Sequence, residues 1–120
     1  MVGPIDSVRV FTHDITLARK FYVRGMGLEE RTSGPGYAVF ATGGADLILE
    51  QVDEEDDEGD GLVGRVAAFS FTVEDCEATV RELAARGVTI IARPARQPWG
   101  GVLAFVEDAD RNVLTLVQHH

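Results

Sequence analysis

An internal duplication is the feature that most constrains how this chain can fold. Residues 7–52 and 67–118 each begin with an alternating segment, continue into a helical pattern and end in short strand-like segments separated by Gly-rich turns. An offset of 61 residues aligns the two openings and pairs Ser7 with Ala68. Solenoids are built from shorter repeats in at least three copies, whereas this chain has two copies of about 60 residues. The sequence therefore predicts two similar βαβββ modules.

The helix of each module is predicted from its N-terminal residue and an apolar stripe. Asp14 and Asp75 precede the helical patterns, where an aspartate accepts hydrogen bonds from the free N–H groups of the first turn. The alternating segments before them have the period of two that half-buried strands show. The apolar stripes have helical spacing and consist of Ile15, Ala18, Phe21 and Tyr22 in the first helix and of Cys76, Val80, Leu83 and Ala84 in the second, which is expected to end before Gly87. These patterns predict the α+β class.

The acidity of the chain is concentrated in one segment. The net charge is −9, and the run DEEDDEGD holds seven of the 20 acidic residues. The other 13 acidic residues nearly balance the 11 basic ones. Because no basic stripe remains to neutralise phosphates, nucleic acid is not expected as a partner.

The same acidic run, residues 53–61, is predicted to be a linker inside a single domain of residues 1–120. It contains no apolar residue and its like charges repel one another. It would join a first module, 4–52, to a second, 62–118. A calcium loop is the alternative, but the glycines do not fall at the sixth position that an EF-hand loop requires.

Three further features suggest a cytoplasmic protein that does not enter a membrane. The chain has no run of 18 apolar residues, and its first six residues lack the basic and apolar regions of a signal peptide. Its one cysteine, Cys76, has no partner for an internal disulfide. The position of Cys76 in the first turn of a helix predicts a lowered thiol pKa.

Several motifs together resemble the vicinal oxygen chelate superfamily of glyoxalases, bleomycin-resistance proteins and dioxygenases. The first module has Phe21-Tyr22 and Gly27-Leu28-Glu29 after its capping aspartate, and the second has Pro98-Trp99-Gly100 and the run FVEDADRN from Phe105 to Asn112. The resemblance implies a half-open barrel of two βαβββ modules that cups a small molecule, and a homodimer. The family turn F-x-x-D-P-D-G-N has glycine where this chain has Arg111, so Asn112 is expected to take the left-handed conformation.

The resemblance also locates the positions at which family enzymes hold a divalent ion through His, Glu or Gln. These positions are occupied by Ser7, Ile48, Ala68 and Thr115. Ala and Ile have no donor atom, and Ser and Thr hydroxyls are poor neutral ligands. A shift of two residues would offer Glu50, but no His completes the set. No metal and no other cofactor are therefore expected.

Strand alternation predicts a pocket independently of the family. Side chains two residues apart share a face of a strand, so Leu47 and Leu49 would face the helix while their neighbours face the ligand. The candidate ligand-binding residues are Arg9, Phe11, Tyr37, Ile48, Glu50, Ser70, Thr72, Trp99, Thr115 and Val117. This mixture of apolar groups, hydroxyls and one charge of each sign suits a small-molecule pocket.

Structural roles are open for several of these residues. Arg9 and Glu50 could pair with each other instead of binding a ligand. Trp99 could stack on a planar ligand or close one end of the barrel. Tyr37 could be purely structural.

Three functions compete at this point. The first is a protein that binds and sequesters a small planar molecule, such as an antibiotic, without a metal or catalytic residues. The second is a metal-dependent lyase, isomerase or dioxygenase whose ligands lie at other positions. The third is a dimeric interaction module without a ligand.

Overall fold

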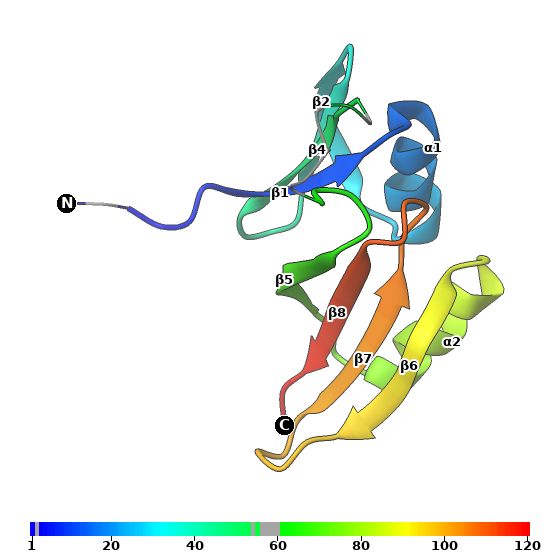
Figure 1. Cartoon of the computed structure of the whole chain (residues 1–120). Coiled ribbons are helices and arrows are strands. Elements are labelled where there is room, and N and C mark those ends of the chain that lie inside the picture. Colours follow the sequence, from blue (N-terminus) through cyan, green and yellow to red (C-terminus); the bar gives the residue numbers. More distant parts are fainter. Residues whose placement is uncertain (2, 54, 56–60) are drawn as a thin grey trace. The chain divides into compact units, whose positions relative to one another are not determined.

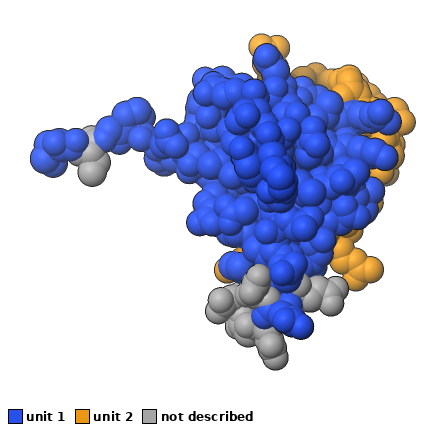
Figure 2. Space-filling model, turned by 90° about the horizontal axis from the view of Figure 1, so that it is seen from above, with its two compact units in different colours: residues 1–63 blue, residues 64–120 orange. Residues whose placement is uncertain are grey.

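The computed structural model describes residues 1, 3–53, 55 and 61–120, which form two compact units of residues 1–63 and 64–120 (Figures 1 and 2). The predicted linker, 53–61, lies mostly outside the described residues, so it stays a prediction, as does a single domain of 120 residues. In the part of the chain that the structure describes, no helix has the length and apolar character needed to cross a membrane.

The first unit is one βαβββ module. Its elements are β1 (Ser7–Thr12), α1 (Ile15–Lys20), the π-helix η1 (Phe21–Gly25), β2 (Glu29–Gly34), β3 (Tyr37–Ala41) and β4 (Asp46–Gln51). The sheet order is β1-β4-β3-β2. The strand β1 runs parallel to β4, and the other neighbours are antiparallel. The predicted cap is confirmed, because Asp14 Oδ1 accepts from the N–H of Leu17 at 3.1 Å.

The second unit repeats this architecture. Its elements are β5 (Val66–Thr72), α2 (Cys76–Ala85), β6 (Thr89–Arg96), β7 (Val102–Glu107) and β8 (Val113–Gln118), with sheet order β5-β8-β7-β6 (Figure 1). Asp75 Oδ1 accepts from the N–H of Ala78 at 3.1 Å, and Gly87 has the positive φ of a residue that ends a helix. The α+β class and the two βαβββ modules are confirmed. Each sheet is open, with two edge strands.

Each unit buries the face of its sheet that meets the helix. In the first unit, Tyr22 and Phe40 are fully buried and their ring centroids lie 5.9 Å apart. The strand residues Leu47 and Leu49 are fully buried on the same face. In the second unit the buried set is Cys76, Val80, Leu83, Val88, Ala104, Val106, Leu114 and Leu116. The prediction that Ala84 belongs to this stripe is wrong, because Ala84 is exposed.

The prediction of a lowered thiol pKa for Cys76 is also wrong. The thiol is fully buried, and this burial, followed by the nearby charges of Glu77 and Asp75, raises the pKa of Cys76. Its backbone N–H donates to Gln118 Oε1 at 2.7 Å. Cys76 is therefore a core residue of α2.

The turn between β7 and β8 differs from the expectation. Arg111, and not Asn112, adopts the left-handed conformation, with φ of 66°. The side chain of Asn112 is instead buried, and its Oδ1 accepts from the N–H groups of Gly64 at 2.8 Å and Arg65 at 3.3 Å. The hydrogen bonds of its side chain thus hold Asn112 in place. The exposed residue before it, Arg111, takes the left-handed backbone conformation.

Replacing Arg111 by glycine is expected to raise the free energy of unfolding by up to about 1 kcal/mol, because glycine removes the Cβ strain of the left-handed region while adding some chain entropy in the unfolded state. Urea denaturation of both proteins measures this difference. Arg93→Gly, at an exposed strand position, serves as the control and should lower stability. A loss of stability in Arg111→Gly would contradict the assigned strain.

Candidate functional site

Five of the predicted site residues share one face of the first sheet, here called the first open face. Arg9 lies opposite Ile48 across the β1–β4 pair, and Phe11 lies opposite Glu50. Across the β3–β4 pair, Glu50 lies opposite Tyr37. These residues alternate with the buried ones that meet the helix, as the period of two predicted. The register thus places Glu50 between the two aromatic residues Phe11 and Tyr37, with Arg9 two residues before Phe11 on β1.

Arg9 and Glu50 form an ion pair on the first open face. Arg9 Nη2 lies 2.7 Å from Glu50 Oε2, and the Arg9 guanidinium carbon lies 5.1 Å from the centroid of the Phe11 ring. The side chains of Arg9 and Glu50 are 55% and 36% exposed. An ion pair this exposed contributes about 1 kcal/mol or less. A charged group of a ligand could therefore replace either partner at little cost.

Tyr37 forms a partly exposed wall beside this pair. It is 40% exposed, and its ring lies over Gly34 across the β2–β3 turn. A Cβ at Gly34 would come within 2.5 Å of Tyr37 Cε1, so a larger residue there would force the ring to move. Much of the surface of Tyr37 stays accessible.

Four predicted residues share the corresponding face of the second sheet, here called the second open face. Ser70 lies opposite Thr115, and Thr72 lies opposite Val117. Ser70 and Thr72 are exposed, Thr115 is half-buried, and Val117 is buried. This face offers hydroxyl groups as hydrogen-bond donors and acceptors.

Trp99 lies on the turn between β6 and β7. Its indole is 47% exposed, and its ring centroid lies 5.9 Å from that of His119. The indole also covers Gly101, where a Cβ would collide with the ring and come within 2.8 Å of the Gln118 carbonyl oxygen. Sequence reasoning assigned no role to His119, and no local pattern could have revealed its contact with Trp99. Trp99 therefore lies close to Gly101 and His119 and remains partly exposed.

The positions that the resemblance assigns to a metal carry no His, Glu or Gln. On the first sheet these positions are Ser7 and Ile48, and on the second they are Ala68 and Thr115, which supply at most neutral hydroxyls. Among the residues that the structure describes, no three His, Cys, Asp or Glu side chains lie together in a group able to hold a metal ion. Glu50, the alternative ligand, pairs with Arg9.

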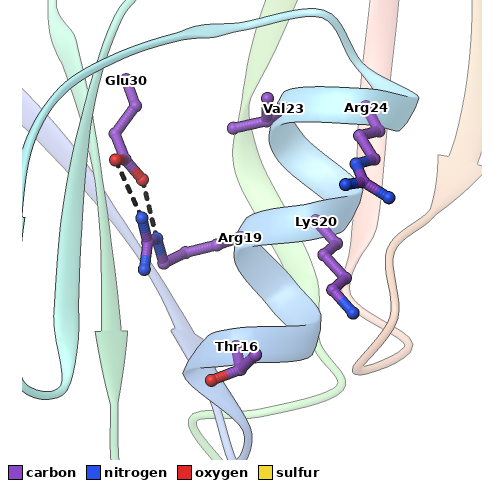
Figure 3. Close-up of a pocket in the computed structure, with 6 residues that line it drawn as sticks. All are labelled: Thr16, Arg19, Lys20, Val23, Arg24 and Glu30. Atoms are coloured by element: carbon purple, nitrogen blue, oxygen red, sulfur yellow. Dashed lines mark hydrogen bonds and ion pairs between the residues drawn. The ribbon is translucent and has the colours of Figure 1, made fainter.

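A hollow of about 370 Å³ lies elsewhere, beside α1 and η1 (Figure 3). Its lining residues are Thr16, Arg19, Lys20, Val23, Arg24 and Glu30. None of the ten predicted ligand-binding residues is among them. The sequence does carry a signal for this site, because residues 15–25 contain three basic residues and no acidic one. The overall acidity of the chain obscured that signal.

The fold agrees with comparisons to known proteins. The family model for the Glyoxalase/Bleomycin resistance protein/Dioxygenase superfamily matches residues 4–116, so the chain belongs to this superfamily. No curated protein matches the chain.

Solved structures show the same fold. A superfamily member from Sphaerobacter thermophilus superposes with a TM-score of 0.84 at 23% identity, covering 98% of each chain. TioX from Micromonospora sp. ML1 gives a TM-score of 0.79 at 20% identity, covering 98% of this chain and 100% of TioX. UcmS2 gives 0.78 at 25% identity, covering 99% of this chain and 100% of UcmS2.

Proposed function

We propose that this protein binds and sequesters a small, planar, partly polar molecule, such as an antibiotic, without a metal ion. The observation that carries this proposal is the donor set at the family's metal positions, where Ser7, Ile48, Ala68 and Thr115 stand. Family chemistry that relies on a metal ion needs charged or imidazole ligands there. Sequestration needs affinity alone, so it does not depend on such ligands.

The chemistry of the first open face supports a planar ligand with a polar group. The accessible ring of Tyr37 and the ring of Phe11 provide surfaces for stacking, and aromatic contacts favour planar partners. The Arg9–Glu50 pair places one positive and one negative group 2.7 Å apart on the same face as these rings. A ligand carboxylate would replace Glu50 as the partner of Arg9, whereas a ligand amine would replace Arg9 as the partner of Glu50.

Trp99 is proposed as a second stacking surface, because nearly half of its indole is accessible. In a thermal-shift screen of planar antibiotics, aromatic acids, thiol conjugates and short keto acids, a true ligand at 100 times its Kd should stabilise the protein by roughly 2.7 kcal/mol. Trp99→Ala should then weaken that ligand by about 1–3 kcal/mol, as measured by calorimetric titration.

Ile91→Ala is the matched control for Trp99→Ala, because Ile91 is an apolar residue of β6 with similar exposure, 49% against 47%. Its affinity for the ligand should equal that of the unaltered protein. If the Trp99→Ala variant binds the ligand as tightly as the unaltered protein but is much less stable, Trp99 has a structural role and does not contact the ligand.

Two alternatives are separated from sequestration by direct measurements. One tightly held divalent ion per chain in protein purified without chelator, lost in Glu50→Ala, would favour a metal-dependent lyase, isomerase or dioxygenase. If no compound in the screen stabilises the protein, a ligand-free interaction module is favoured. We also propose a homodimer as the working assembly, in line with the resemblance, and a cytoplasmic location in line with the single cysteine.

A further inference from the structure

The α1–η1 segment carries positive charge that the module does not require. It contains Arg19, Lys20 and Arg24 and no acidic residue, in a chain whose net charge is −9. Basic residues near the end of a helix interact favourably with its dipole. However, α2 occupies the same place in the second module with an acidic residue in its first turn and no basic residue in its last turn. The fold therefore forms without such a basic cluster.

The three basic side chains fall into two groups. Arg19 extends to Glu30, and its Nε and Nη2 donate to the two carboxylate oxygens at 2.7 and 2.9 Å (Figure 3). The hydrogen bond from Arg19 lowers the pKa of Glu30, so this pair stays ionised at neutral pH. In the view of Figure 3, Lys20 and Arg24 extend away from Glu30, and both line the same hollow as Arg19 and Val23. Both are exposed, and neither has a carboxylate partner among the described residues.

The hollow beside these residues combines charge with an apolar surface. Val23 is 41% exposed and lines it together with the hydroxyl-bearing Thr16. Its volume of about 370 Å³ falls in the range of small-molecule pockets. The helix widens here into η1, where the N–H of Met26 donates to the Phe21 carbonyl at 3.0 Å. Single π-turns of this kind occur frequently at functional sites.

From these observations we infer that the hollow binds a small anion with an apolar body, such as an organic phosphate or carboxylate. Lys20 and Arg24 hold the anionic group, and the apolar part lies against Val23 and the aliphatic portions of the basic side chains. The charges of Arg19 and Glu30 neutralise each other, and the pair forms one wall of the hollow. The hollow shares no residue with the two open faces, so its binding can be tested apart from the function proposed for them.

Phenyl phosphate is a suitable probe, because it joins a dianion to a planar apolar ring. In ¹H–¹⁵N spectra of the whole chain, its titration should shift the amide signals of residues 16–25 in a saturable way. Inorganic phosphate should bind several-fold more weakly, and benzylamine, which has the ring but a positive charge, should shift none of these signals. Raising the salt concentration should weaken binding, since the charges are exposed.

The double variant Lys20→Gln, Arg24→Gln should bind phenyl phosphate about tenfold more weakly, since each exposed charge contributes a factor of about two to five. Arg81→Gln is the matched control, because Arg81 lies 61 residues after Lys20 and is exposed on α2. Its binding should be unchanged. The proposal is overturned if the amide signals of residues 16–25 do not move, if benzylamine moves them equally, or if the double variant binds as tightly as the unaltered protein.

Discussion

Replacing Phe40 by alanine is expected to lower the free energy of unfolding by about 3–5 kcal/mol, the usual cost of removing a buried aromatic ring. Phe40 is fully buried, pairs with Leu47 across β3 and β4, and its ring centroid lies 5.9 Å from that of Tyr22 on η1. The substitution removes the ring contact between β3 and Tyr22 of η1. Urea denaturation followed by circular dichroism measures the loss at a constant m-value.

Val39→Ala is the matched control, because Val39 is adjacent in β3, lies opposite Ile48 and is only half-buried. It should cost about 1.5 kcal/mol or less, since the methyl groups that it removes are only partly shielded from water. An equal loss in the two variants would mean that Phe40 is not the anchor of this core.

The same variant tests whether residues 1–120 form a single domain. Trp99, the one tryptophan of the chain, lies in the second unit, whereas Phe40 lies in the first. If the two units unfold together, the fluorescence and circular dichroism midpoints of Phe40→Ala should fall together. A fluorescence midpoint that stays unchanged would show that the units unfold separately, and the single-domain prediction would be wrong.

The second large effect is expected for Asn112→Ala, which should destabilise the protein by about 2–4 kcal/mol. Asn112 is 2% exposed. Its Nδ2 donates to Asp108 Oδ2 at 2.9 Å, and its Oδ1 accepts from the N–H of Gly64 at 2.8 Å. Alanine leaves the buried carboxylate of Asp108 and the part-buried N–H of Gly64 without this partner, and an unsatisfied buried group costs about 1–3 kcal/mol.

The control for this variant is Gln51→Ala, in which an exposed amide side chain is removed. Gln51 Oε1 accepts from the N–H of Ile15 at 2.9 Å, but water can replace that bond. Its cost should be about 1 kcal/mol or less. Denaturation of both variants under the same conditions gives the comparison. Similar losses would show that the buried bonds of Asn112 contribute no more than an exposed one.

Much of the fold follows from local patterns in the sequence. The capping bonds of Asp14 and Asp75 join residues three apart, and a residue's immediate neighbours decide such bonds. The period of two in β1 and β4 predicts which side chains share a face, because it is a property of the extended backbone itself. The duplication and the family motifs then identify two βαβββ modules and the family, and the family match over residues 4–116 confirms the latter.

The candidate site could be predicted only in part. Alternation correctly placed Arg9, Phe11 and Glu50 on one face, as the strand register shows. It left open whether Arg9 and Glu50 pair, because a contact between residues 41 positions apart depends on the register of β1 against β4. The hollow beside α1 was missed, since residues 15–25 meet Glu30 only after β2 folds back along the helix.

The sequence alone thus determined the elements, their caps, the repeated module and the lack of His, Glu or Gln at the positions that the resemblance assigns to a metal, because each depends on residue type and short-range spacing. Only the tertiary structure shows that Arg9 pairs with Glu50 and that Arg111 is left-handed. It alone also shows the raised pKa of Cys76 and the position of Trp99 over Gly101. These features depend on burial and on contacts between separate elements, which arise only when the strands and helices pack together.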